Sequence, residues 1–260
     1  MSSSVSSELE NGPIWALGLP LVPLSRAKVV EMVDRLIQAR EPSYFITANL
    51  NYAMLTSRNK DLREINQRAA FILADGMPLV WTAKWRRKPL PERVAGSDLI
   101  FDLCGLAEEQ GYRVYLFGAG PGVAEQAAGN LGSRYPSLQI VGIESANLSE
   151  LSQVEHAAVL DQVRSARPDL LFVALGQPKG ERWIFANYRD LAVPVSVQVG
   201  ASLDFVAGRV SRAPRVLQRL GLEWVYRLML EPRRLTRRYF DNGIFFLSRI
   251  LKGDQDEQES

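Results

Sequence analysis

The fold is indicated by two segments of the sequence, Phe45-Ile-Thr-Ala-Asn-Leu-Asn51 and Phe71-Ile-Leu-Ala-Asp-Gly-Met-Pro78. In each segment an apolar run ends in polar residues, and the stretch between them predicts a helix. This order is typical of a strand, a helix and a second strand in a parallel sheet. Successive parallel strands deliver their carboxyl ends to one edge, where open α/β folds bind ligands. The hydroxyl, amides and carboxylate that follow the two strands are therefore expected to meet.

The same alternation continues along the chain, with apolar residues at helical spacing or in continuous buried runs. A strand or hairpin is expected at residues 15–22, and Ser25 is the predicted N-cap of the first helix. Helices are expected at residues 28–39, 53–68, 123–134 and 150–166, and another is expected to begin near Pro78. Further strands are expected at residues 113–118, 138–143, 170–175 and 195–199. The predicted fold class is α/β, a Rossmann-like, mostly parallel sheet with flanking helices and a helical C-terminal appendage.

Composition divides the chain into four segments. Residues 1–13 are expected to form a flexible leader, residues 14–210 an α/β catalytic core, residues 211–252 a helical, basic, membrane-associating appendage and residues 253–260 an acidic tail. The apolar run at residues 244–251 is shorter than the roughly 20 residues that span a bilayer. It either rests in the membrane interface or packs on the core, and the sequence leaves both interpretations open.

The overall composition is that of a soluble protein, because 47% of the 260 residues are hydrophobic, 23% are charged and the net charge is +2. The amino terminus lacks the pattern of a signal peptide, so the expected location is the cytoplasm. The single cysteine, Cys104, excludes an intramolecular disulfide and is expected to be buried. The single histidine, His156, excludes histidine triads and zinc sites and is expected on a solvated surface. Asp254 and Asp256 match a metal-binding D-x-D pattern but lie in a polar tail, so no metal site is expected.

Asp75 is the strongest candidate for acid–base chemistry. It stands where a buried strand meets a turn, a location that raises a carboxyl pKa and suits a general base. The alternative is a carboxylate that caps the next helix, and the local pattern does not decide between the two. A capping role is preferred for Asp98, which follows Arg93-Val-Ala-Gly-Ser97 and precedes another predicted helix.

A glycine-rich turn, Gly118-Ala-Gly-Pro-Gly122, joins the strand predicted at residues 113–118 to the helix that follows. Such a turn exposes backbone amides suited to phosphate at a helix amino terminus. The dinucleotide fingerprint is incomplete because Val123 stands where its last glycine or alanine belongs. The turn is interpreted as a generic connection that at most contacts a nucleotide.

Three arginines of the appendage, Arg227, Arg234 and Arg237, would share one face of a nearly continuous helix. Guanidinium groups bind diphosphates bidentately, so this face is a candidate clamp for a departing nucleoside diphosphate. Attraction to anionic lipid headgroups and a plain solvated face are alternatives. Nucleic acid is not expected as a partner, because no recognisable nucleic-acid-binding module surrounds these arginines.

Taken together, the ordered motifs resemble the WecG/TagA/CpsF glycosyltransferase family, over about Trp15 to Phe246. The motifs are Thr47-Ala-Asn-Leu-Asn51, Ala74-Asp-Gly76, Arg93-Val-Ala-Gly-Ser-Asp98, Gly176-Gln-Pro-Lys-Gly-Glu181, Gly200-Ala201 with Asp204 and Arg212-Ala-Pro214, Gly221-Leu-Glu-Trp224 with Arg227, Glu231-Pro-Arg-Arg234 and Tyr239.

The resemblance implies an inverting, metal-independent and cofactor-free transferase in cell-surface polysaccharide synthesis. It would move N-acetylmannosamine, its uronic acid or glucose from a UDP-sugar to a polyprenyl-diphosphate-linked saccharide, in peripheral contact with the inner face of the cell membrane. By motif position Asp75 would be the base, with Thr47 and Asn49 as the other catalytic residues. The substrate-binding residues would be Arg93, Gln177, Gly176, Lys179, Gly118, Gly200, Arg227, Arg234 and Arg237.

Two other functions stay open at this point. The α/β pattern and glycine turn alone would also fit a noncatalytic nucleotide-binding module, and a transferase with a soluble acceptor would fit the core without its appendage. Self-association occurs within the family that the chain resembles, so a homo-oligomer is among the expectations.

Overall fold

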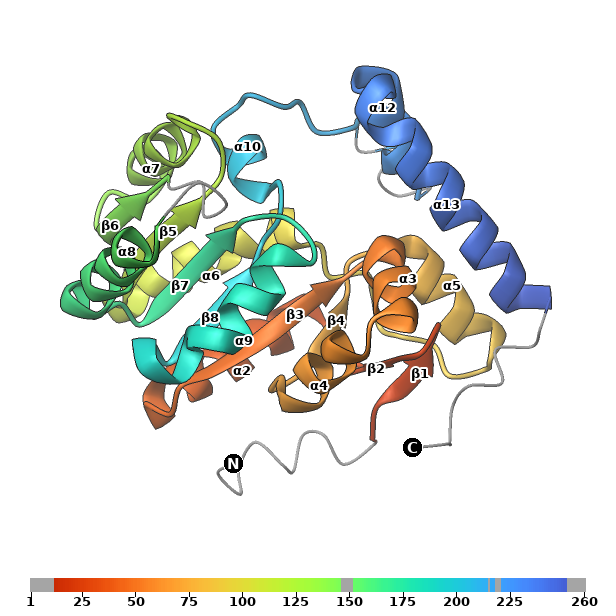
Figure 1. Cartoon of the computed structure of the whole chain (residues 1–260), viewed down its shortest axis with the longest axis horizontal. Helices are drawn as coiled ribbons and strands as arrows, with labels where there is room; N and C mark the ends of the chain where they lie inside the picture. The colour runs from red at the N-terminus through yellow and green to blue at the C-terminus, as the bar shows by residue number, and fades with distance from the viewer. Residues whose placement is uncertain (1–11, 146–151, 215, 218–220, 252–260) are drawn as a thin grey trace.

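A computed structural model describes residues 12–145, 152–214, 216–217 and 221–251 of the chain. It confirms the predicted fold class, because a six-stranded sheet of parallel strands lies between two layers of helices (Figure 1). The strand order is β4-β3-β8-β7-β5-β6. These strands are β3 (Ser43–Ala48), β4 (Ile72–Ala74), β5 (Arg113–Gly118), β6 (Gln139–Glu144), β7 (Leu170–Ala174) and β8 (Val195–Gln198). The predicted acidic tail and most of the predicted leader lie outside the described residues.

Each face of the sheet carries its own apolar core, because successive side chains of a strand point to opposite faces. Phe45 of β3 belongs to the first core, and its neighbours Tyr44 and Ile46 belong to the second. The first core is covered by α2 (Arg26–Ala39), α6 (Gly96–Gln110), α7 (Val123–Arg134) and α10 (Ser202–Val206). The second is covered by α3 (Leu50–Arg58), α4 (Lys60–Arg68), α5 (Met77–Trp85), α8 (Gln153–Ala166) and α9 (Lys179–Leu191).

Local signals at the start of the chain act as predicted. The antiparallel strands β1 (Ile14–Ala16) and β2 (Leu19–Leu21) form the expected hairpin, with positive φ at both turn residues, Leu17 and Gly18. Ser25 caps α2, since its hydroxyl accepts from the backbone N–H of Lys28. Cys104 is fully buried, and burial raises the pKa of its thiol to about 12.

The single helix predicted at residues 53–68 is wrong, because α3 and α4 are separate helices that meet at Asn59. The backbone of Asn59 is extended, with φ −125° and ψ 117°. Its side-chain amide donates to the carbonyl of Leu55 at 2.7 Å. Asparagine side chains compete in this way with the backbone hydrogen bonds of a helix, which explains the break.

Two other expectations are corrected. Asp98 is not a helix cap, because α6 takes its N-cap position at Ala95 and Asp98 pairs instead with Arg212. His156 is not simply solvated: it is half-buried, and its Nε2 accepts a hydrogen bond from the indole N–H of Trp183 at 3.0 Å. The tryptophan ring gains a polar partner where it enters the second core.

The described part of the appendage includes the helices α12 (Glu223–Leu230) and α13 (Pro232–Leu251), which lie along one side of the core (Figure 1). The break at Glu231 corrects the expectation of a nearly continuous helix, so Arg227 and Arg237 lie on different helices. At the start of the appendage, Gly221 has φ +73°, and a Cβ there would come within 2.7 Å of the Met77 side chain. Only glycine allows this close approach to α5.

The segment at residues 244–251 carries apolar side chains on two faces, one that packs on the core and one that is exposed. Phe245 is buried in the second core, and the ring of Phe246 lies 6.1 Å from that of Trp85 on α5. On the opposite face, four apolar side chains are each more than half exposed. We call this row the apolar stripe, and it consists of Phe240, Ile244, Leu247 and Leu251, at the i, i+4, i+7 and i+11 positions of one helix face. Within the part of the chain that the structure describes, no helix is both long and apolar enough to cross a membrane.

Candidate functional site

The candidate site lies at the carboxyl edge of the sheet, where four adjacent strands end. Thr47 and Asn49 lie at the end of β3, and Asp75 follows β4. Gly176 and Gln177 follow β7, and Gly200 follows β8. Because β4, β3, β8 and β7 are neighbours in that order, the segments that follow them form one continuous rim. The sequence-based expectation that these polar residues share an edge therefore agrees with the sheet order.

Three side-chain oxygens of this rim converge on Gly96, the first residue of α6. A Cβ placed there would lie 3.4 Å from Thr47 Oγ1, 3.6 Å from Ser202 Oγ and 3.8 Å from Asp75 Oδ2. Thr47 and Ser202 are held in place, since their hydroxyls donate to the carbonyls of Gln198 and Val199. The start of α6 therefore lies within van der Waals range of all three oxygens. Ser202 is a site residue that the sequence analysis did not select.

Asp75 carries the electrostatic signature expected of a base. Burial is the main cause that raises the pKa of its carboxyl to about 7, the positive charge of Arg93 lowers it, and Glu223 raises it. The N–H of Gly96 lowers the pKa further, and Asp98 raises it. The capping alternative is wrong, because Gly76 occupies the N-cap position of α5. A carboxyl with this pKa can take a proton near neutral pH.

Arg93 lies in an ion-pair network that joins the core to the appendage. Its Nη1 lies 3.0 Å from Glu223 Oε2 on α12. The second oxygen of Glu223, Oε1, lies 3.9 Å from the Nε of Arg212. Arg212 binds both carboxylate oxygens of Asp98. We call these four residues, Arg93, Glu223, Arg212 and Asp98, the interface network, and Glu223 is its only member on α12.

The asparagines that follow β3 hold the rim together. Asn49 caps α3, because its Oδ1 accepts from the N–H of Tyr52 at 3.1 Å. Asn51 donates from Nδ2 to the Oε1 of Gln177 at 3.4 Å and so links the ends of β3 and β7. Lys179, at the start of α9, is exposed. The structure thus gives Asn49 a structural role, to which its predicted catalytic role would be additional.

The three glycines predicted to bind substrate all have positive φ, at Gly118, Gly176 and Gly200. Gly118 is also required by contact, since a Cβ there would lie 3.0 Å from the backbone of Ala174 at the end of β7. The N–H of Gly200 donates to the Gln198 side chain at 3.2 Å. These positions allow backbone turns close to the rim, where backbone donors can face a ligand.

The appendage arginines differ in their surroundings. Arg227 is half-buried, and its guanidinium lies 5.3 Å from the centroid of the Phe205 ring on α10. Its Nε makes no hydrogen bond to the part of the chain that the structure describes. Arg237 is exposed on α13, and the Arg234 side chain lies outside the described atoms. Since Arg227 follows Glu223 by four residues, both side chains lie on the same face of α12.

Glu181, the last residue of the motif Gly176-Gln-Pro-Lys-Gly-Glu181, is a further buried carboxylate at the rim. It lies in the first turn of α9 and is 1% exposed. Neither of its carboxylate oxygens accepts a hydrogen bond from residues 12–145, 152–214, 216–217 or 221–251. Burial raises the pKa of this carboxyl to about 8, despite the lowering effects of its own backbone N–H and of Gln177.

Replacing Glu181 by glutamine is expected to stabilise the protein increasingly as the pH rises. The pKa is about 8 in the fold and 4.5 in the reference state, so the folded protein holds the proton more tightly. Wild-type stability therefore falls between these two pH values, and the variant escapes this loss. Calorimetry at pH 5 and pH 8 should show a gain of several degrees at pH 8 only, given about 2–4 °C per kcal/mol in proteins of comparable size.

The control for this experiment is Glu109→Gln, which alters an exposed glutamate of α6. It should change the melting temperature equally little at both pH values. An equal gain from Glu181→Gln at pH 5 and pH 8 would show that the ionisation of Glu181 does not differ between folded and unfolded protein.

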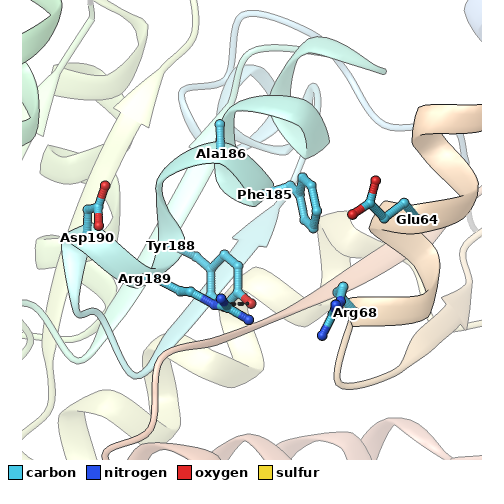
Figure 2. A pocket seen from close by; sticks show the side chains of 7 residues that line it. All are labelled: Glu64, Arg68, Phe185, Ala186, Tyr188, Arg189 and Asp190. Atoms are coloured by element: carbon cyan, nitrogen blue, oxygen red, sulfur yellow. Dashed lines mark hydrogen bonds between the residues drawn. The ribbon is translucent and has the colours of Figure 1, made fainter.

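A cavity of about 380 Å³ lies between α4 and α9, and Figure 2 shows the side chains that line it. Because α9 starts at the carboxyl edge and runs back across the sheet, the last residues of this helix lie toward the opposite edge. The lining contains none of the rim residues and consists of Glu64, Arg68, Phe185, Ala186, Tyr188, Arg189 and Asp190. This cavity is separate from the candidate site.

Comparison with known proteins identifies one family. The model of the glycosyl transferase WecG/TagA/CpsF family matches residues 14–259. An N-acetylglucosaminyldiphosphoundecaprenol N-acetyl-beta-D-mannosaminyltransferase of Bacillus subtilis (strain 168) is 32% identical over 221 residues, covering 83% of this chain and 84% of the relative. The protein of the same name from Staphylococcus aureus (strain NCTC 8325 / PS 47) is 32% identical over 239 residues, covering 90% of this chain and 91% of the relative.

Proposed function

The chain belongs to the WecG/TagA/CpsF family of glycosyltransferases, and from this membership we propose that it moves a sugar from a UDP-sugar to a polyprenyl-diphosphate-linked saccharide. The names of the relatives favour N-acetylmannosamine as the sugar and N-acetylglucosaminyl-diphosphoundecaprenol as the acceptor, ahead of the uronic acid or glucose. The observation that carries the proposal is Asp75, a carboxyl with a pKa of about 7 whose Oδ2 converges with the hydroxyls of Thr47 and Ser202 on the start of α6 at the rim.

The proposed reaction is a direct displacement with inversion. Asp75 takes the proton of an acceptor hydroxyl as the oxygen attacks C1 of the donor sugar. The new C1–O bond forms as the bond from C1 to the phosphate oxygen breaks, and the electron pair leaves with UDP. Thr47 and Ser202 lie near the Asp75 carboxylate, since all three residues place an oxygen within 4 Å of the Gly96 Cβ position.

The departing diphosphate needs positive charge, which the proposal assigns to arginines. Arg227 faces the core from α12, and Arg93 lies close enough to lower the pKa of Asp75. Guanidinium groups bind phosphate oxygens bidentately and stabilise charge that develops in the transition state. Such groups can take the role that a divalent metal has in other transferases, so we propose a metal-independent reaction.

The test is release of UDP from a panel of UDP-sugars, in EDTA, with a polyprenyl-diphosphate-linked N-acetylglucosamine acceptor. Turnover with UDP-N-acetylmannosamine is the expected result, and turnover with another donor would correct the sugar alone. No turnover with any donor, despite tight UDP binding and a verified acceptor, would favour the noncatalytic nucleotide-binding module. Activity that EDTA abolishes and a divalent metal restores would overturn the metal-independent mechanism.

We also propose that the appendage rests on the inner face of the membrane through the apolar stripe. An exposed row of large apolar residues on one face of a helix is typical of interfacial binding. The exposed arginines Arg233, Arg237 and Arg238 lie in the first half of the same helix and would attract anionic headgroups. A lipid-linked acceptor would then meet the enzyme at the bilayer surface.

Replacing Leu247 of the apolar stripe by aspartate is expected to weaken binding to vesicles that contain anionic lipid by about tenfold or more, since burial of a leucine contributes about 1.5–3 kcal/mol. The control is Val154→Asp on α8, which changes an apolar residue outside the appendage that is even more exposed than Leu247. Co-sedimentation measures the binding. Equal loss in both variants, or none in either, would contradict a role of the stripe.

The same variant separates a lipid-linked from a soluble acceptor. Leu247→Asp should lose activity on the vesicle-bound acceptor and keep it on a short-chain, water-soluble analogue. Undiminished activity on the vesicle-bound acceptor would favour a transferase that does not depend on the membrane.

A further inference from the structure

The pair formed by Arg93 and Glu223 is placed where the appendage meets the site. The two residues are 130 positions apart, and their side chains are only 16% and 14% exposed. Ion pairs shielded from water to this extent are costly to break on one side, because the remaining charge loses its partner. A shielded ion pair therefore lies at the contact between α12 and the rim.

We propose that Glu223 is a positioning residue: its carboxylate holds the Arg93 guanidinium at the rim beside Asp75, so that docking of α12 completes the catalytic arrangement. This inference rests on the proposed function, because it assigns Asp75 and Arg93 to the reaction. Glu223 would be a negatively charged site residue on the appendage, where the other proposed site residues, Arg227, Arg234 and Arg237, are all arginines.

The charges around Asp75 explain why such a residue is useful. Arg93, at the approach to α6, lowers the pKa of the Asp75 carboxyl, whereas Glu223 of α12 and Asp98 of α6 raise it. Arg212, the fourth member of the interface network, also interacts electrostatically with Asp75. Arg93 forms its ion pair with Glu223, so its charge acts on both carboxylates and lowers the pKa of Asp75 less than a direct ion pair would. A base held this way keeps a proton affinity suited to neutral pH.

Docking of α12 also sets where Arg227 lies. Glu223 and Arg227 are four residues apart, and they contact Arg93 and Phe205 respectively. The carboxylate therefore anchors one turn of the helix, and the next turn presents the guanidinium assigned to the diphosphate. Loss of the Glu223 carboxylate should therefore alter both the pKa of Asp75 and the placement of Arg227.

The experiment compares the full-length wild type with Glu223→Gln, which keeps the side-chain shape and removes the charge. The acidic limb of the pH profile of kcat/KM should move down by about one pH unit, because the negative charge of Glu223, which raises the pKa of the Asp75 carboxyl, is lost while the amide still holds Arg93 in place. The plateau of kcat should fall by about tenfold, because α12 docks less tightly and Arg227 loses its placement. Glu223→Asp should restore part of the wild-type limb.

The control is Asp241→Asn, which removes a carboxylate from α13 outside the interface network and should leave both limb and plateau unchanged. A second measurement needs no turnover: hydrogen exchange of the α12 amides should be faster in Glu223→Gln than in wild type or Asp241→Asn. An unmoved limb would overturn the positioning role, whatever the exchange shows. Unchanged exchange would overturn the docking role.

Failure of this inference is distinguishable from failure of the proposed function. A wild type that turns over no UDP-sugar would refute the proposed function. The exchange of α12 would still decide, in that case, whether Glu223 holds the appendage on the core.

Discussion

Asparagine at position 75 is expected to lower kcat by about 10²–10⁴-fold, the range typical of losing a general base. The amide fits the same space but cannot accept the proton of the acceptor hydroxyl. The dissociation constant for the donor should change little, because the residues proposed to bind the diphosphate are Arg93 and Arg227. Single-turnover kinetics with calorimetric measurement of donor binding separates the two effects.

The same substitution should not cost stability. The pKa of Asp75 is about 7 in the fold and 3.8 in the reference state, so the stability that depends on this group falls as the pH rises through that interval. Asp75→Asn should therefore unfold at pH 8 at a temperature equal to or above that of the wild type. Wild-type kcat/KM should in turn rise with pH up to about 7, as the base loses its proton.

The control is Asp61→Asn, which breaks an exposed ion pair with Arg182 on the outer surface. Turnover of this variant should match that of the wild type. Loss of a general base should lower turnover by about a hundredfold or more. If Asp75→Asn retained more than about a tenth of wild-type turnover, another group would have to take the proton.

Alanine at position 227 is expected to lower kcat by about 10²–10³-fold, the scale seen when one donor to a developing negative charge is removed. The kcat of Arg227→Lys should lie between those of Arg227→Ala and the wild type, because lysine keeps the charge but not the bidentate geometry. Affinity for UDP should fall in the same order. Product-release and burst kinetics determine whether the loss falls on the chemical step.

The chain offers a matched control for this change. Arg249 also lies over an aromatic ring, 5.5 Å from the centroid of Phe245, but toward the far end of α13. Arg249→Ala removes a comparable cation–π contact from a side chain that is half-buried, as Arg227 is. Equal turnover of the two alanine variants would show that the diphosphate is bound elsewhere.

The strands were predictable because each carries its own signal. Strand β5 and helix α7 have the predicted bounds, since apolar runs, glycines and helical spacing are local properties of the sequence. The break at Asn59 was missed because the apolar spacing continues across it, and only the asparagine itself signals a cap. Asp98 was misassigned because its partner Arg212 is 114 residues away.

The site was predictable only in part, for a related reason. Parallel strands bring Thr47, Asp75 and Gly200 to one edge whatever the side chains are, so their proximity follows from the order of elements. The pairing of Arg93 with Glu223 depends on how α12 docks, which the contact of Gly221 with α5 helps to set. The signal present in the sequence was a glutamate between Leu222 and Trp224, a charge in an otherwise apolar run.

The burial of Cys104 makes the natural chain practically inert to thiol reagents at neutral pH. Its thiol is 0% exposed and its pKa is raised to about 12, so almost no thiolate is present to react. A cysteine introduced on the exposed face of α13 would then be the one site that takes a spin label or fluorophore. Depth-dependent quenching from such a label can chart where each turn of the helix sits in a bilayer, without removal of the native residue.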